Sequence, residues 1–282
     1  MENGGRTLPA VIAACSLATI VISAISPVRA ADSSAWSRDS HSAFRLIAGS
    51  NAAGATALRA GIEIKLDPGW HTYWRYPGDS GVPPRFDFSQ SDNLSAATVL
   101  YPVPHLYSDE TGNTLGYKDA VIFPVRVVPK ETDKPVTARL KFEYAVCEKV
   151  CVPVEGMAEL ALTAGASALD APLKAAEARV PKAVSAAQAG LTLHRTPGGA
   201  KPMVTVDLDA PAGANVALFV EGPTSDWALP IPQPLPAADA NHRRFSFALD
   251  GLPPRVNPNA PVDLIFTIVE GSRALEVRTH LD

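Results

Sequence analysis

Hydrophobic and polar residues alternate along most of the chain, which is the pattern of β-strands. Residues 41–66 show the alternation twice, on either side of a turn at Asn51–Gly54. Pro, Gly and aromatic residues then predict a loop from Asp67 to Pro84. Shorter strands are predicted afterwards at Ala97–Tyr101, Val121–Val128, Val136–Val146 and Met157–Leu162. The first half of the chain is therefore expected to be a β-sheet domain.

The same pattern returns from Leu191 to the end of the chain. Short apolar stretches recur there, separated by turn residues; they include Leu191–Leu193, Val204–Leu208, Val216–Val220, Phe245–Leu249 and Leu264–Ile268. Strands with little helix between them are typical of β-sandwiches. Residues 191–282 are therefore predicted to form a second β-sandwich domain.

An Ala-rich segment, 166–190, separates the two patterns. Asp170 followed two residues later by Pro172 resembles a helix start, with Asp as the cap. An apolar stripe through Leu173 predicts a short helix that ends before Pro181. We predict an all-β protein: two β-sandwich domains, 31–165 and 191–282, joined by this Ala-rich linker with its short helix.

The first thirty residues are typical of a secretory signal peptide. Arg6 is followed by the apolar stretch Leu8–Ile25, and Val28-Arg29-Ala30 offers a cleavage site. No later segment approaches the ~20 apolar residues that span a bilayer. We therefore expect residues 1–30 to be removed and the mature protein to be periplasmic, without membrane insertion. The net charge of −4, without basic clusters, argues against nucleic-acid binding.

Two cysteines, Cys147 and Cys151, remain after the signal peptide and its Cys15 are removed. They could form a structural disulfide, a redox pair or part of a metal site. A disulfide closing about five residues contributes only about 2 kcal/mol, against about 4.7 kcal/mol for a hundred-residue loop. A chain of this length can bury a sufficient core without such help. The spacing therefore favours a redox role in an oxidising compartment.

The residues around the cysteines predict a β-hairpin. Lys141–Cys147 alternates as a strand that ends at Cys147, Glu148–Val150 forms the turn, and Cys151–Val154 begins the return strand. Only a thiolate attacks a disulfide, so a useful pair must be reachable by a partner sulfur. A pair at a hairpin end satisfies that requirement.

A second dense segment runs from Trp70 to Pro84 and holds two of the chain's four Trp and two of its six Tyr within seven residues. Its aromatic side chains either close one end of the core or cover the cysteines as a recognition loop. The residues to consider for a covering or binding role are Trp70, His71, Tyr73 and Trp74. The sequence leaves both interpretations open.

Three segments, Trp70–Pro84, Gly112–Tyr117 and Tyr144–Gly156, resemble in order and spacing the N-terminal periplasmic domain of DsbD-type thiol:disulfide interchange proteins. The similarity covers about residues 40–165 and is closer to the ScsB-like branch. It implies an immunoglobulin-like fold with Cys147 and Cys151 as the redox pair. It also implies thioredoxin-like redox partners, periplasmic or membrane-tethered, that supply electrons for client proteins. Larger members continue into a membrane domain and a thioredoxin-like domain, and we expect no segment of this sequence to form either.

The expected function is thus thiol:disulfide interchange through Cys147 and Cys151, as a protein-disulfide reductase or a dithiol carrier. Whether the chain acts as an enzyme stays open. One alternative is copper binding or delivery, because a Cys-x3-Cys spacing also occurs in copper proteins. The other is a non-catalytic binding module with a structural disulfide. No cofactor and no resident metal are expected, since Val152–Gly156 holds no His and two cysteines fall short of a zinc site.

Overall fold

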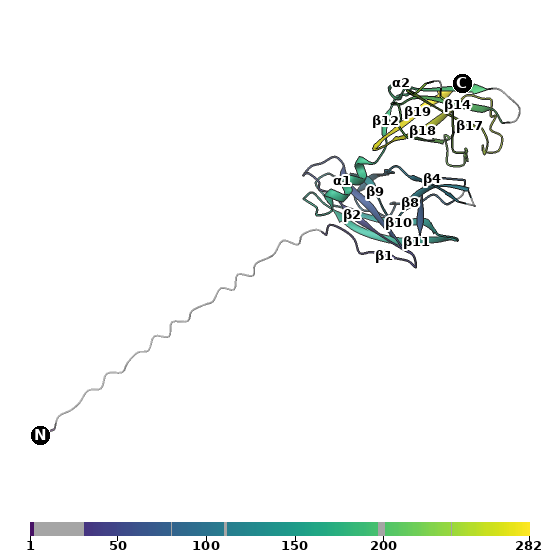
Figure 1. Cartoon of the computed structure of the whole chain (residues 1–282). Coiled ribbons are helices and arrows are strands. Elements are labelled where there is room, and N and C mark those ends of the chain that lie inside the picture. The colour runs from purple at the N-terminus through teal and green to yellow at the C-terminus, as the bar shows by residue number, and fades with distance from the viewer. Residues whose placement is uncertain (3–30, 80, 110–111, 197–200, 238) are drawn as a thin grey trace.

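The computed structural model describes residues 1–2, 31–79, 81–109, 112–196, 201–237 and 239–282. The predicted signal peptide therefore lies almost wholly outside the described residues. Four β-sheets pack as two sandwiches that follow each other along the chain (Figure 1). The all-β fold predicted from the alternation and the immunoglobulin-like architecture of two sandwich domains implied by the resemblance are confirmed.

One sheet of the first sandwich has the order β1-β2-β3-β9-β6. Its strands are Ser37–Arg38 (β1), Ser42–Ala48 (β2), Leu58–Leu66 (β3), Ala120–Pro129 (β9) and Leu94–Val99 (β6). β2 and β3 are the two strands predicted within residues 41–66. Their alternating positions, such as Phe44 and Ile62, are buried in the core because successive side chains of a strand point to opposite faces.

The facing sheet has the order β11-β10-β4-β8-β7, and β5 pairs with β10. Its strands are Cys151–Leu162 (β11), Val136–Cys147 (β10), His71–Gly78 (β4), Gly112–Lys118 (β8), His105–Asp109 (β7) and Arg85–Asp87 (β5). The aromatic segment predicted as a loop is thus largely a strand, β4. Its alternation is hard to recognise because Thr72, Tyr73 and Trp74 are all buried.

The predicted helix is α1, Asp170–Ala178, and it is docked on the first sandwich. Leu173 is fully buried, and a side chain at Gly61 would lie 3.0 Å from it. Arg59 on β3 forms ion pairs of 2.7 Å with both Asp170 and Glu177. Asp170 is the first residue of the helix rather than its cap.

The rest of the expected linker belongs with the second sandwich. Lys182–Val184 forms β12, which pairs in parallel with β19 (Arg273–Leu281), and Ala186–Ala189 forms the short helix α2. Ser185 caps α2 through a capping box, and Gly190 ends it in the left-handed conformation. Residues 166–190 are therefore divided between the two sandwiches. The domain boundaries 31–165 and 191–282 stay a prediction.

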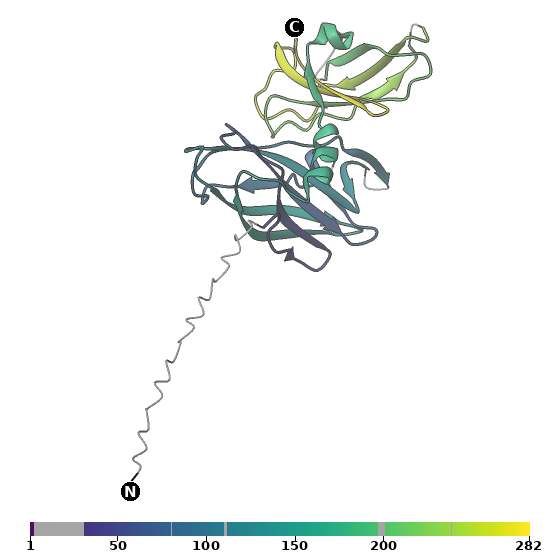
Figure 2. The same cartoon turned by 90° about the vertical axis from the view of Figure 1, so that its left-hand side faces the viewer.

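The second sandwich consists of two four-stranded sheets, β12-β19-β18-β15 and β13-β14-β17-β16. Its remaining strands are Leu191–Thr196 (β13), Met203–Asp209 (β14), Val216–Glu221 (β15), Gln233–Leu235 (β16), His242–Ala248 (β17), Val262–Glu270 (β18) and Arg273–Leu281 (β19). It lies beside the end of the first sandwich that carries β4 and α1 (Figure 2). Phe219 and Ile231 from this sandwich pack into the core of the first one.

Candidate redox site

The two cysteines form a disulfide across the end of the β10–β11 hairpin. Cys147 is the last residue of β10, Cys151 is the first of β11, and their Sγ atoms are 2.02 Å apart. The two cysteines differ in exposure. Cys147 is 6% exposed and lies opposite His71 of β4, whereas Cys151 is exposed.

Tyr73 is the side chain that the fold brings to this disulfide. Its hydroxyl oxygen lies 2.9 Å from Cys151 Sγ. A disulfide sulfur has no proton, so the hydroxyl donates this hydrogen bond. The ring is only 2% exposed and packs with Ala145 and Cys147 in a small cluster of its own. The same hydroxyl would donate to a Cys151 thiolate after reduction, and hydrogen bonds to an ionised acceptor are stronger.

The other aromatic candidates lie elsewhere. Trp74 follows Tyr73 on β4, belongs to the main core and contacts the ring of Phe219 in the second sandwich. Trp70 stacks on His41 at a centroid distance of 3.8 Å. His71 stays close to the site and meets the Tyr73 ring edge-on at 5.4 Å. Neighbouring residues of a strand face opposite ways, so Tyr73 and Trp74 cannot both lie against the disulfide.

The backbone at Gly81 covers the Tyr73 ring. Gly81 has φ +130°, and a Cβ there would lie 2.4 Å from Tyr73 Cε1, so only glycine fits this close approach. Just before it, Asp79 accepts hydrogen bonds from the backbone and side-chain N–H groups of Asn113 at 2.8 and 3.1 Å. The motifs Trp70–Pro84 and Gly112–Tyr117 therefore contact each other, and this contact holds the backbone that covers Tyr73.

An aromatic and basic surface extends from His71 across β8 and β7. The Lys118 ammonium lies 4.1 Å from the centre of the Tyr107 ring, an arrangement in which the cation is attracted to the ring face. Burial foremost raises the pKa of Tyr107. Burial, followed by the charge of Arg179, lowers the pKa of His105. His105 is thus favoured in its neutral form.

Beyond Tyr73, strand β4 is attached to the second sandwich. Arg75 donates to Glu221 at 2.7 and 2.9 Å and to Glu276 at 2.7 Å. Burial opposes the charge of Arg75, but the two carboxylates outweigh it and raise the pKa of the guanidinium. The Tyr76 hydroxyl donates to the backbone carbonyl of Leu229. The sequence pattern does not reveal these residues, because nothing near Arg75 indicates that Glu221, 146 positions later, is its partner.

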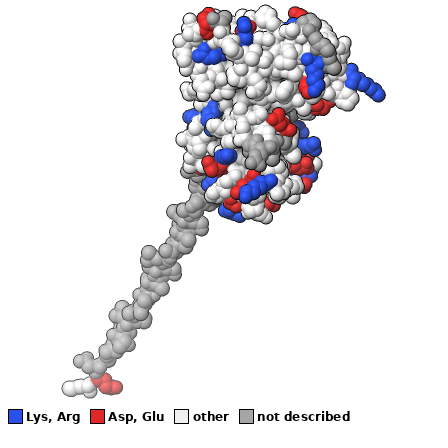
Figure 3. Space-filling view, turned by 45° about the vertical axis from the view of Figure 1, so that its right-hand side comes forward, with Lys and Arg blue, Asp and Glu red and all other residues white. Residues whose placement is uncertain are grey.

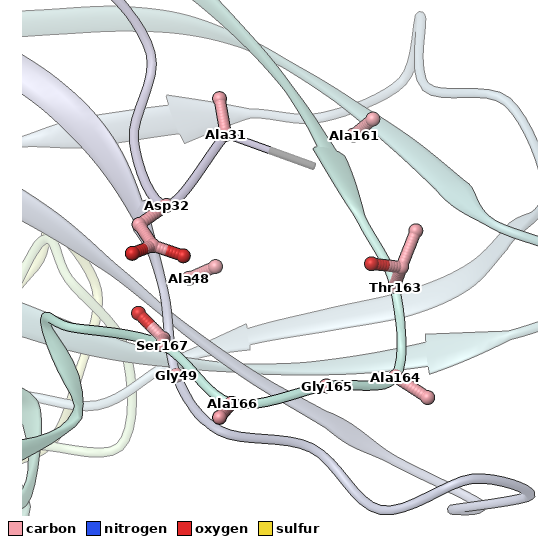
Figure 4. Close-up of a pocket in the computed structure, with 10 residues that line it drawn as sticks. All are labelled: Ala31, Asp32, Ala48, Gly49, Ala161, Thr163, Ala164, Gly165, Ala166 and Ser167. Atoms are coloured by element: carbon pink, nitrogen blue, oxygen red, sulfur yellow. The ribbon is translucent and has the colours of Figure 1, made fainter. Parts of the chain in front are cut away.

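A surface hollow of about 300 Å³ lies near the far end of β11 (Figure 4). Eleven residues of strand, or about 36 Å, separate Leu162 from Cys151. The lining is mostly small, and its charged residue Asp32 already accepts a hydrogen bond from Ala168 N. The hollow therefore offers no reactive cluster near the cysteines.

Among the described residues, no three His, Cys, Asp or Glu side chains gather as metal ligands would. No described helix is long and apolar enough to cross a membrane. On the face shown in Figure 3, basic and acidic side chains are interspersed. The disulfide with Tyr73 is the site that the described geometry supports best.

An immunoglobulin-like domain with a partly exposed disulfide at a hairpin end is the class of protein that this fold and site define. Residues 41–163 match the family described as thiol:disulfide interchange protein DsbD, N-terminal. The first sandwich therefore matches the model of the DsbD N-terminal family, which confirms the resemblance that the three motifs indicate. The match includes both cysteines.

A solved structure shares the fold of most of the chain. The N-terminal periplasmic domain of ScsB from Proteus mirabilis aligns with a TM-score of 0.68 at 20% identity, covering 89% of this chain and 98% of that one. A marsupial T cell receptor aligns at a TM-score of 0.21 and 9% identity, covering 86% and 98%, and carries no argument. No curated protein matches the sequence.

Proposed function

We propose that this protein is a periplasmic dithiol carrier that passes reducing equivalents from a thioredoxin-like donor to exported client proteins. The observation that carries the proposal is the disulfide between buried Cys147 and exposed Cys151, beside a tyrosine hydroxyl. The family of the first sandwich and the predicted signal peptide support the compartment and the reaction class.

Reduction begins when a donor thiolate attacks the Sγ of exposed Cys151. The Cys147–Cys151 bond breaks, a donor–Cys151 disulfide forms, and Cys147 leaves as a thiolate that takes up a proton. A second donor thiolate then attacks its neighbour in the mixed disulfide and releases Cys151. Two electrons and two protons have moved to this protein, and the donor is left as a disulfide.

Reduction of a client follows the reverse order. The Cys151 thiolate attacks the client disulfide and forms a mixed disulfide, and Cys147 attacks Cys151 to release the client as a dithiol. Tyr73 stabilises the Cys151 thiolate by donating its hydroxyl hydrogen. Val150, exposed in the hairpin turn and directly before Cys151, offers apolar contact to a docking protein. Val82 is also exposed and follows Gly81, whose backbone approaches the Tyr73 ring.

Trapping of mixed disulfides tests the proposal. A Cys147→Ala variant keeps the reachable thiol but cannot resolve, so it should accumulate disulfide-linked thioredoxin-like proteins in the periplasm. The matched Cys151→Ala variant, whose remaining thiol is buried, should capture far less. Equal trapping by both variants, or none, argues against the proposal. A reduction potential below about −300 mV, typical of structural disulfides, also argues against it.

A further inference from the structure

Strand β4 serves two sites at once. Tyr73 donates to Cys151 Sγ, while Trp74, Arg75 and Tyr76, the next three residues, make the contacts with the second sandwich. A displacement of one residue along an extended chain is about 3.3 Å, which exceeds the tolerance of a hydrogen bond. Tyr73 is the last residue of β4 before the register shift, so the way the following residues are held adds to the packing of its ring in fixing the hydroxyl.

The sheet itself holds this part of β4 weakly. β4 pairs with β10 at His71 and Thr72 and with β8 as far as Tyr73, which lies opposite Gly116; after Tyr73 the pairing with β8 shifts register until Gly78. Within the described ladders, residues 74–77 have no regular strand partner. Side-chain contacts must supply the restraint that ladder hydrogen bonds supply elsewhere.

The second sandwich supplies those contacts. The Arg75 guanidinium is clamped by Glu221 on β15 and Glu276 on β19, whose side chains are only 12% and 15% exposed. Paired, partly buried charges of this kind impose a defined geometry, because an Arg fork matches carboxylates at fixed angles. Tyr76 adds a hydrogen bond to Leu229 between the same two bodies.

We propose that Arg75 is a positioning residue through which the second sandwich holds Tyr73 against Cys151 and so sets the redox equilibrium of the disulfide. Residues 191–282 thereby have a role in the redox site. This role rests on the proposed function only in that both involve the Cys147–Cys151 pair. Without the clamp, the hydroxyl leaves the sulfur and the thiolate of the reduced form loses its donor. The equilibrium then moves toward the disulfide.

The test measures the equilibrium constant of the pair against glutathione, for the full mature chain and without any protein partner. Tyr73→Phe keeps the ring and removes the donor, and should shift the constant toward the disulfide by about two- to tenfold, the range for one hydrogen bond. The double variant Glu221→Gln/Glu276→Gln keeps the side-chain shapes and should shift it in the same direction. The matched control is Asp207→Asn, which breaks the Arg244–Asp207 ion pair elsewhere on the second sandwich and should change nothing.

The decisive measurement combines the changes, because residues that act through one another are non-additive. With Tyr73→Phe already present, the two Glu→Gln changes should have no further effect on the redox constant. Additive shifts, or no shift from the Glu→Gln changes alone, overturn the proposal. If the double variant fails to fold by circular dichroism, Arg75→Lys replaces it and must give the same non-additivity. Since glutathione replaces any partner, failure here leaves the trapping result for the proposed function untouched.

Discussion

Replacing both cysteines with Ala should cost little stability if the disulfide is a redox pair. In the chain-entropy model, a closed loop of about five residues restricts the unfolded chain by about 2 kcal/mol. The structure adds one further contribution. Cys147 is 6% exposed and packs with Tyr73 and Ala145, so removing its sulfur loses about 1 kcal/mol of buried apolar contact.

The hairpin itself does not depend on the bond. β10 and β11 pair without interruption from Val136 opposite Leu162 to Cys147 opposite Cys151. The disulfide therefore closes the end of a ladder that hydrogen bonds and core packing already hold. We expect the double variant to unfold within about 3 kcal/mol of the oxidised protein, with about 2 kcal/mol from the crosslink.

Urea unfolding measures this difference, provided that the two sandwiches are followed separately. Hydrogen exchange read by mass spectrometry does so, because peptides from β10 report the first sandwich alone. The reduced wild-type protein is the matched control, since it lacks the bond but keeps both sulfurs. It should fall between the oxidised protein and the double variant. A loss of 4 kcal/mol or more on reduction alone would make the bond a structural staple and refute the redox interpretation.

Three further outcomes are expected. Tyr73→Ala should speed iodoacetamide modification of the reduced cysteines without unfolding the protein. Trp74→Ala should lower the free energy of unfolding by about 3–5 kcal/mol and leave the modification rate unchanged. The reverse pattern contradicts the placement of the two rings. Leu173→Ala should cost about 2–5 kcal/mol and expose α1 to limited proteolysis between residues 164 and 190, whereas the parent should be cut there slowly; rapid cutting of the parent indicates an undocked helix. Hydrogen bonds from Lys174, Ser50 N and Arg59 lower the pKa of Asp170 in the folded protein. The ionised carboxylate therefore stabilises the fold above about pH 4, and this contribution is lost as the pH falls. The urea midpoints of the parent and Asp170→Asn should therefore differ at pH 7 and converge in acid. A difference that grows as the pH falls contradicts the lowered pKa.

The alternation of apolar residues was sufficient to predict an all-β protein, because side-chain burial in a strand repeats every two residues whatever the topology. The hairpin at the cysteines was also local: a strand pattern through Tyr144 and a three-residue turn predict that Cys147 and Cys151 meet. The helix near Leu173 was predicted as a linker, however. Its docking depends on Gly61 and Arg59, which lie over a hundred positions earlier.

The surroundings of the disulfide were decided by the tertiary structure. In sequence, Tyr73 and Trp74 are equivalent aromatic neighbours; only the register of β4 against β10 turns Tyr73 to the sulfur and Trp74 to the second sandwich. The pairing of Arg75 with Glu221 likewise requires two sandwiches to meet in one orientation. Local pattern records which face of a strand is buried, but not what it is buried against, because that depends on the packing of segments far apart in the chain.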